Sequence, residues 1–273
     1  MATVAAAIRA ALLECDPRAK VMAARQVARD WRLGRLEPTF DRAMPDAPGR
    51  PDRPELLAPK HMPKRRKGGS ERGRIALWHS LAHIEFVAID LALDMAGRFG
   101  GEMDRAFVSD FLQIAAEEAM HFALIDRHLR TMGSFYGALP AHSGLWDAAD
   151  ATRQDVAARL AVVPMVLEAR GLDVTPAMLE RVRASGDHTG AVILVRILDD
   201  EIRHVAAGVK HFVGWAQARG LQPDSLWKSK VREHFSGQLK EPFNDSARRS
   251  AGLSREWYTS LVPLTPSEIP AFS

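Results

Sequence analysis

Residues 111–129 read FLQIAAEEAMHFALIDRHL, and this stretch decides the fold because its apolar residues recur at the spacing of one helix face. Glu118 falls inside the apolar stripe, and His121 lies three residues further on, on nearly the same face. A carboxylate in an apolar seam is costly unless it is paired or bound to a metal ion. The stretch therefore predicts a long, buried helix that carries metal-ligand side chains. The stripe consists of Phe111, Ile114, Ala115, Phe122, Ile125 and Leu129.

A second Glu-x-x-His sequence, Glu201 to His204, lies within another long helical pattern. A chain of this length contains about one such match by chance, so the evidence for a metal site comes from the spacing between the motifs and two further Glu residues. Glu85 precedes Glu118 by 33 residues, and Glu168 precedes Glu201 by the same number. Two helical hairpins with this spacing would bring four Glu and two His to one point. The predicted metal ligands are Glu85, Glu118, His121, Glu168, Glu201 and His204.

Carboxylate and imidazole ligands without thiolate favour iron or manganese over a structural zinc ion. Four carboxylates neutralise a pair of divalent ions, so we expect two metal ions, with iron preferred and manganese as the alternative. An acidic residue stands directly before each motif, and a ligand histidine needs an acceptor for its other ring N–H. We predict that Asp200 accepts from His121 and that Glu117 accepts from His204.

The remaining pattern is helical throughout, without a run of alternating strands, and predicts an all-α protein with a four-helix bundle at its centre. Seven of the sixteen prolines fall between Pro38 and Pro63, where no periodicity survives. This segment is either a flexible linker or an arm that wraps the domain. The predicted parts are N-terminal helices at 1–34 that break at Asp16, a Pro-rich basic arm at 35–73, the bundle at 74–220 and a C-terminal helical extension packed on the bundle at 221–273.

Within the bundle, long helices are predicted over 75–99, 102–132, 152–170 and 187–219. Pro164 is expected to kink the third of them, because proline lacks the N–H that the helix ladder needs. Gly171 is expected to end that helix and Thr175-Pro176 to begin a short new one. Residues 133–147 are expected to form a long connection.

Composition excludes several classes of protein. A single cysteine, Cys15, excludes an internal disulfide framework and any multi-cysteine zinc or iron–sulfur site, and it is expected to be a small core residue. No stretch of 18 apolar residues and no secretory signal pattern occur, so we expect a cytoplasmic protein without a membrane partner. His79 and His83 lie off the face of Glu85 and are expected to be packing or surface histidines rather than ligands.

One short segment is strongly basic, although the net charge of the chain is only +3. Residues 60–74 hold seven Lys and Arg against Glu71 alone. A charge run of this kind is usually a solvated loop, and no aromatic residues interleave with it to stack on bases. Contact with nucleic acid is therefore a weak alternative.

The six ligand positions resemble the ferritin-like di-metal carboxylate proteins, which carry one Glu on each of two helices and a Glu-x-x-His on each of the other two. A closer resemblance, to the DUF455 family of ferritin-like proteins, rests on further segments outside the ligand set. These segments are HSGLWD at His142–Asp147, LEARGLDVTP at Leu167–Pro176, EPFN at Glu241–Asn244, and Ala247-Arg248.

The resemblance implies a di-metal site that activates O₂ or peroxide to oxidise a small-molecule substrate, with an electron donor that the sequence does not name. Two alternatives stay open. One is metal binding, ferroxidase activity or storage without an organic substrate, and the other is an RNA-modifying hydroxylase similar to the tRNA adenosine hydroxylase. A ribonucleotide reductase subunit is disfavoured because Ile125 stands where those proteins carry a radical tyrosine. An oligomer is compatible with all of these hypotheses.

Overall fold

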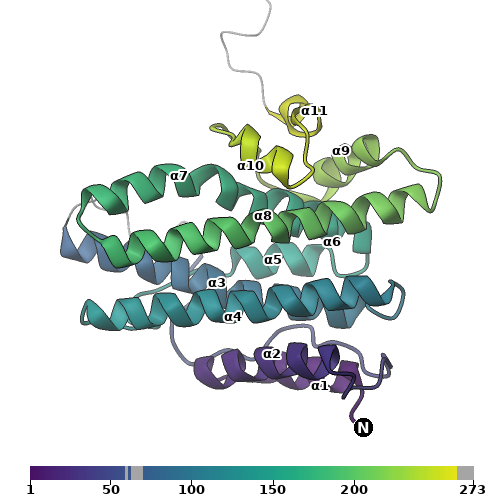
Figure 1. Ribbon diagram of the computed structural model, residues 1–273, viewed down its shortest axis with the longest axis horizontal. Helices are drawn as coiled ribbons and strands as arrows, with labels where there is room; N and C mark the ends of the chain where they lie inside the picture. The colour runs from purple at the N-terminus through teal and green to yellow at the C-terminus, as the bar shows by residue number, and fades with distance from the viewer. Residues whose placement is uncertain (59–60, 63–69, 263–273) are drawn as a thin grey trace, which may run out of the picture. The chain divides into compact units, whose positions relative to one another are not determined.

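The computed structural model describes residues 1–58, 61–62 and 70–262, and these residues confirm the predicted all-α class (Figure 1). The described residues form helices and connecting loops and no strand; extended pairing within them is limited to two isolated bridges, Thr3 with Glu37 and Leu56 with Ala141. Most of the predicted basic segment, including Lys60 and 64–67, lies outside the described residues.

The chain divides into two compact units. Unit 1 comprises Met1–Arg153 and Leu179–Ile197, and unit 2 comprises Gln154–Met178 and Leu198–Ser273. Unit 1 contains α1 (Val4–Leu13), α2 (Pro17–Arg32), α3 (Glu71–Phe99), α4 (Arg105–Thr131) and α5 (Gly144–Ala151). Unit 2 contains α6 (Val156–Val162), the π-helix η2 (Val163–Glu168), α9 (Pro223–His234), α10 (Asp245–Ser250), α11 (Arg255–Tyr258) and the 3-10 helix η3 (Thr259–Leu261). Two helices have residues in both units, α7 (Ala169–Ala184) and α8 (His188–Gln217).

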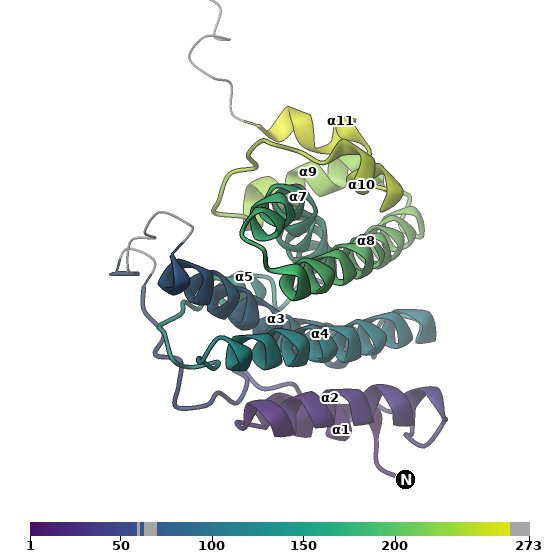
Figure 2. The same cartoon turned by 60° about the vertical axis from the view of Figure 1, so that its left-hand side comes forward.

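The centre of unit 1 is the hairpin of α3 and α4, which lie side by side in both views (Figures 1 and 2). The predicted break between the first two helices is confirmed: Asp16 caps α2 by accepting the N–H of Ala19 at 2.8 Å. α2 packs along α4, and α1 packs on α2 and α3. Cys15 is exposed, so the prediction that it is a core residue was wrong. It lies in the turn between α1 and α2, outside the buried face of either helix.

α3 has the length and hydropathy of a helix that could cross a membrane. However, 67% of its most apolar window is buried inside the protein, as in the core helix of a globular domain. The high hydropathy of α3 is therefore explained by its central place in unit 1.

The described part of the Pro-rich arm, residues 35–58, wraps unit 1. The N–H of Gly49 donates to the carbonyl of Leu12 at 2.8 Å, and the N–H of Leu57 donates to the carbonyl of Ala141 at 2.8 Å. Lys20 is fully buried and donates to the carbonyl of Gly49 at 2.8 Å. Of the two interpretations left open by the sequence, these contacts favour the wrapping arm.

Two expectations about helix ends were wrong. Residues 144–147, placed in the predicted connection, belong to α5, which covers Gly144–Ala151. The helix expected to stop at Gly171 continues to Ala184, so Pro176 lies inside α7. Proline removes the N–H that would bond the carbonyl four residues earlier, Leu172. The side-chain amide of Asn244 donates to that carbonyl at 3.1 Å instead, so a partner distant in sequence compensates for the missing bond.

The predicted disturbance at Pro164 takes the form of the π-helix η2 rather than a simple kink. Gly208 of α8 approaches Pro164 so closely that an added Cβ would lie 2.5 Å from the proline ring. Glycine at this position therefore permits close packing of α8 on η2 within unit 2.

The C-terminal extension is fixed to α7 by a buried ion pair. Arg248 donates to both carboxylate oxygens of Asp173, at 2.8 and 2.7 Å, and both side chains are buried. Arg170 reaches the same stretch of chain through the carbonyls of Lys240 and Pro242. The extension is thus part of unit 2.

Candidate metal centre

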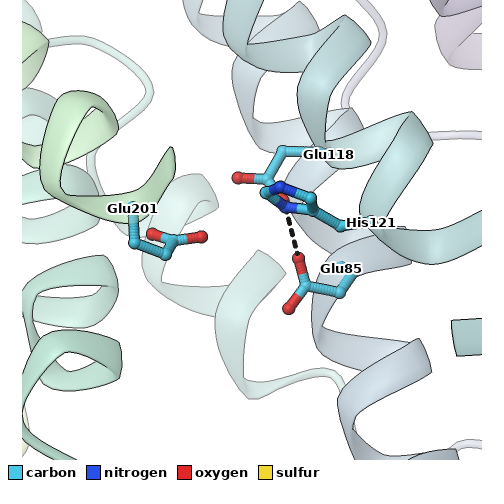
Figure 3. A group of neighbouring side chains, drawn as sticks. All are labelled: Glu85, Glu118, His121 and Glu201. Atoms are coloured by element: carbon cyan, nitrogen blue, oxygen red, sulfur yellow. Dashed lines mark hydrogen bonds and ion pairs between the residues drawn. The ribbon is translucent and has the colours of Figure 1, made fainter. Parts of the chain in front are cut away.

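Three predicted ligands meet inside unit 1, between α3 and α4. Nδ1 of His121 lies 3.2 Å from Oε2 of Glu85 and 3.3 Å from Oε2 of Glu118 (Figure 3). Glu118 and His121 are fully buried, and Glu85 is 5% exposed. Two carboxylates and an imidazole are thus removed from water together.

The geometry of the helical hairpin explains why these residues meet. Glu85 lies 14 residues before the end of α3 at Phe99, and Glu118 lies 13 residues after the start of α4 at Arg105. At about 1.5 Å per residue both legs are about 20 Å long, so the two side chains reach the same height. The three-residue step from Glu118 to His121 keeps both on one face of α4.

The electrostatics of this group favour a cation. Burial and the neighbouring carboxylate of Glu118 raise the pKa of Glu85 well above its usual range. Burial alone would lower the pKa of His121, but its hydrogen bonds to Glu118 and Glu85 outweigh burial and raise the pKa to about 11. In the metal-free protein a proton on the imidazole therefore compensates the carboxylates. A metal ion would replace that proton and release it on binding.

The second Glu-x-x-His sequence lies on α8, within unit 2. His204 is fully buried, and the side chain of Glu201 is 12% exposed. Their Nδ1 and Oε1 atoms are 3.6 Å apart. Glu168 ends η2 and is partly buried. A π-helix has more residues per turn than an α-helix, so it changes the direction in which the side chain of Glu168, its last residue, leaves the helix. Pro164 at the start of η2 therefore contributes to the position of this carboxylate.

Three of the six predicted ligands, Glu85, Glu118 and His121, form a buried group within unit 1 that could hold a metal ion (Figure 3). Glu168, Glu201 and His204 lie in unit 2. Their participation, and the presence of two ions rather than one, stay predictions.

The two residues predicted to support the ligand histidines differ in their surroundings. Glu117 is partly buried and accepts from the side-chain amide of Gln113 at 3.0 Å. Asp200 is buried and forms an ion pair with Arg203 one turn later on α8. The pairings of Asp200 with His121 and of Glu117 with His204 stay predictions.

Sequence reasoning missed the residue that fixes the start of α8. One carboxylate oxygen of Asp187 accepts the N–H of Gly190 at 2.7 Å, and the other accepts from the indole of Trp78 at 3.1 Å and lies 2.9 Å from Nε2 of His128. These contacts anchor the start of α8, the helix that carries Glu201, to α3 and α4. The Asp-x-x-Gly pattern was visible as a helix cap, but its two aromatic partners were not.

His79 and His83 have structural partners. Nε2 of His79 accepts the N–H of Gly137 at 2.9 Å. His83 bonds the hydroxyl of Tyr136 through Nδ1 and the carbonyl of His142 through Nε2, each at 3.0 Å. Both histidines hold the connection between α4 and α5 against α3.

Comparisons of the chain with known proteins identify a family that it matches. The model of the family described as "Protein of unknown function (DUF455)" matches residues 13–259. A Haemophilus influenzae protein described as "Uncharacterized protein" is 42% identical over 211 residues, which cover 75% of this chain and 73% of the relative. No solved structure matches the chain.

Proposed function

The chain belongs to the DUF455 family, and we propose that it is a ferritin-like di-metal carboxylate protein that activates O₂ or peroxide to oxidise a small-molecule substrate. The observation that carries the proposal is the buried group of carboxylates and imidazole on α3 and α4. A protein interior tolerates such a concentration of negative charge only when a cation or bound protons compensate it.

The donor set fits the proposed metal. Glu85 and Glu118 offer hard carboxylate oxygens, and His121 offers an imidazole nitrogen of intermediate softness, as iron and manganese prefer. The chain has one cysteine, and that cysteine lies exposed between α1 and α2. A thiolate-based zinc or iron–sulfur alternative therefore has no ligands in this region.

The repeated sequence pattern supports two ions rather than one. The hairpin of α3 and α4 supplies one half of the ligand set, and η2 with α8 supplies a half of the same composition. In the proposed site each half provides two carboxylates and one imidazole, so the six ligands carry four negative charges toward two divalent ions. The proposed ligands are Glu85, Glu118, His121, Glu168, Glu201 and His204.

Bound iron or manganese would supply Lewis acidity and the electrons for reducing O₂ or peroxide. The chain's own residues have three tasks in this proposal. The apolar seams of α3 and α4 exclude water from the ligands. The imidazole of His121 gives up its proton when a metal binds, which makes metal affinity dependent on pH. The carboxylates of Glu85 and Glu118 balance the charge of the ions and leave coordination positions for O₂ or peroxide.

Metal content tests the proposal directly. We expect the purified protein to hold about two iron or manganese ions per chain. Glu118→Gln, His121→Gln and Glu201→Gln should each lower that number, because each removes one donor. Glu180→Gln and His188→Gln are matched controls, since both residues are exposed on the adjacent helices. Equal metal content in the parent and in all three ligand variants would overturn the proposal.

Oxygen consumption separates the proposed oxidase from metal storage. After anaerobic loading with ferrous iron, an oxidase should consume O₂ in proportion to a fixed pair of ions. A storage protein should instead continue to oxidise and retain iron well beyond that pair. Retention of many irons per chain would contradict the oxidase and favour the storage alternative.

A further inference from the structure

A second candidate site lies in unit 1, away from the carboxylate group. A pocket of about 150 Å³ opens between the Pro-rich arm, α3 and α5. This volume suits a molecule of about the size of one aromatic ring. Its lining is almost entirely apolar, with one cationic group. The residues that matter for the argument are Ala47, Arg50, His83, Val87, Ser143 and Trp146.

The rim of the pocket is fixed by main-chain contacts. Gly49 packs so tightly on the end of α1 that an added Cβ would lie 2.2 Å from the carbonyl oxygen of Leu13. The N–H of Ala141 donates to the carbonyl of Glu55 at 2.9 Å, which ties the arm to the start of the α5 segment. The pocket is therefore held open by the fold.

Arg50 brings a positive charge to this pocket. Its guanidinium lies 2.7 Å from Asp90, and its side chain is only 22% exposed. Asp90 is shared with the ammonium of Lys20, at 2.6 Å, and both of these side chains are fully buried. Two cations thus face one carboxylate.

The charge of this group does not depend on where the shared proton lies. Burial lowers the pKa of Lys20 and raises the pKa of Asp90. If the proton lies on Lys20, the two residues form an ion pair, and if it lies on Asp90, both are neutral. In either case their sum is zero, and Arg50 leaves one positive charge beside an apolar pocket.

The other polar groups of the lining are already engaged. Because a carbonyl only accepts, Nε2 of His83 donates to His142, and Nδ1 accepts from Tyr136. The hydroxyl of Ser143 donates to the exposed carboxylate of Asp147 at 2.8 Å. Within the described part of the chain, Arg50 forms an ion pair with Asp90 and no hydrogen bond, so N–H groups of the guanidinium can bind a ligand.

We propose that this pocket binds a small organic carboxylate with an apolar, ring-sized body. The carboxylate pairs with Arg50, and the body lies against Trp146 and Val87. One face of the guanidinium is covered by the ring of Phe86, at 5.6 Å, so its edge carries the interaction with the ligand. Bidentate pairing of this edge with a carboxylate is the geometry that arginine favours.

Calorimetry with three probes tests this proposal. Benzoate has both the ring and the charge, benzyl alcohol has the ring alone, and acetate has the charge alone. We expect benzoate to bind at least about 10-fold more tightly than either, because a charge-assisted hydrogen bond contributes a factor of about 10 to 100. Equal affinity for benzoate and benzyl alcohol, or no benzoate binding at about 10 mM, would refute the carboxylate site.

Variants identify the pocket as the place of binding. Arg50→Met should weaken benzoate binding at least about 10-fold, while Arg35→Met, at an exposed arginine of the same unit that does not line the pocket, should leave it unchanged. Ala47→Leu adds bulk at an exposed residue that lines the pocket and takes no part in the ion pairs, so it should weaken benzoate binding even if Arg50→Met fails to fold. Unchanged benzoate affinity in Ala47→Leu would overturn the proposal.

Discussion

The buried pair of Arg248 and Asp173 gives a prediction about stability that can be worked out from the structure. Arg248→Met removes two charge-assisted hydrogen bonds, of 2.8 and 2.7 Å, and leaves a buried carboxylate. Removing one member of a buried pair costs about 3–5 kcal/mol. The N–H of Asn244, at 2.9 Å, and the half-exposed guanidinium of Arg170, at 3.5 Å, still stabilise Asp173. We therefore expect a loss near the lower limit, about 3 kcal/mol.

Urea unfolding, followed by tryptophan fluorescence and by far-UV circular dichroism, measures this loss. Asp173→Asn should cost a similar amount, and the double variant should cost about 2 kcal/mol less than the sum of the two single changes, because the pair is removed as a whole. Arg249→Met is the matched control, since that arginine is exposed on the same helix. A loss below about 1 kcal/mol for Arg248→Met, or strict additivity in the double variant, would refute the reasoning.

Three further predictions concern unit 1. Burial lowers the pKa of His79 and of His83 from 6.5 to about 4, so the unfolded chain binds more protons than the folded chain between these values. Their contribution to stability is complete above pH 6.5 and is lost as the pH falls toward 4. Urea unfolding at pH 5 should therefore show a loss of about 2 kcal/mol per histidine. Replacing both histidines by Gln should flatten the dependence of the unfolding free energy on pH. Asp187→Ala removes the cap of α8 and the acceptor for two aromatic N–H groups, and thermal or urea unfolding should show a cost of about 2–3 kcal/mol, with no change at all counting against the cap. Gly49→Ala should destabilise the protein by about 1–3 kcal/mol in the same assay, because its Cβ would collide with the carbonyl of Leu13, and a neutral result would mean that the arm does not lie against α1.

Much of the helical framework could be predicted from the sequence, since long amphipathic periods and caps are local signals. The break at Asp16 and the helices over residues 71–99, 105–131 and 188–217 follow such signals. The continuation of α7 through Pro176 could not be predicted in this way. It depends on Asn244, whose amide replaces a missing helix bond from a position 72 residues away.

The buried group of Glu85, Glu118 and His121 was predictable because the spacing of side chains along one face is also a local property of helices. The Glu-x-x-His step and the equal legs of the hairpin place Glu85, Glu118 and His121 together. The partners of Asp187 and of Lys20 could not be predicted, because each joins three segments distant in sequence. Buried polar networks of this kind leave no periodic pattern.

The segments that carry the closer family resemblance have structural tasks. Asp173 and Arg248 form the buried pair of unit 2. His142 accepts from His83 through its carbonyl, and Trp146 lines the pocket beside Arg50. These positions fix the C-terminal extension and the arm, and they lie outside the six proposed ligand positions.

The most direct test of the central claim is anomalous diffraction from crystals of the iron- or manganese-loaded protein. We expect two ions about 3.5–4 Å apart, held by Glu85, Glu118, His121, Glu168, Glu201 and His204. Ions bound elsewhere on the chain, with these six side chains free of metal, would contradict the account.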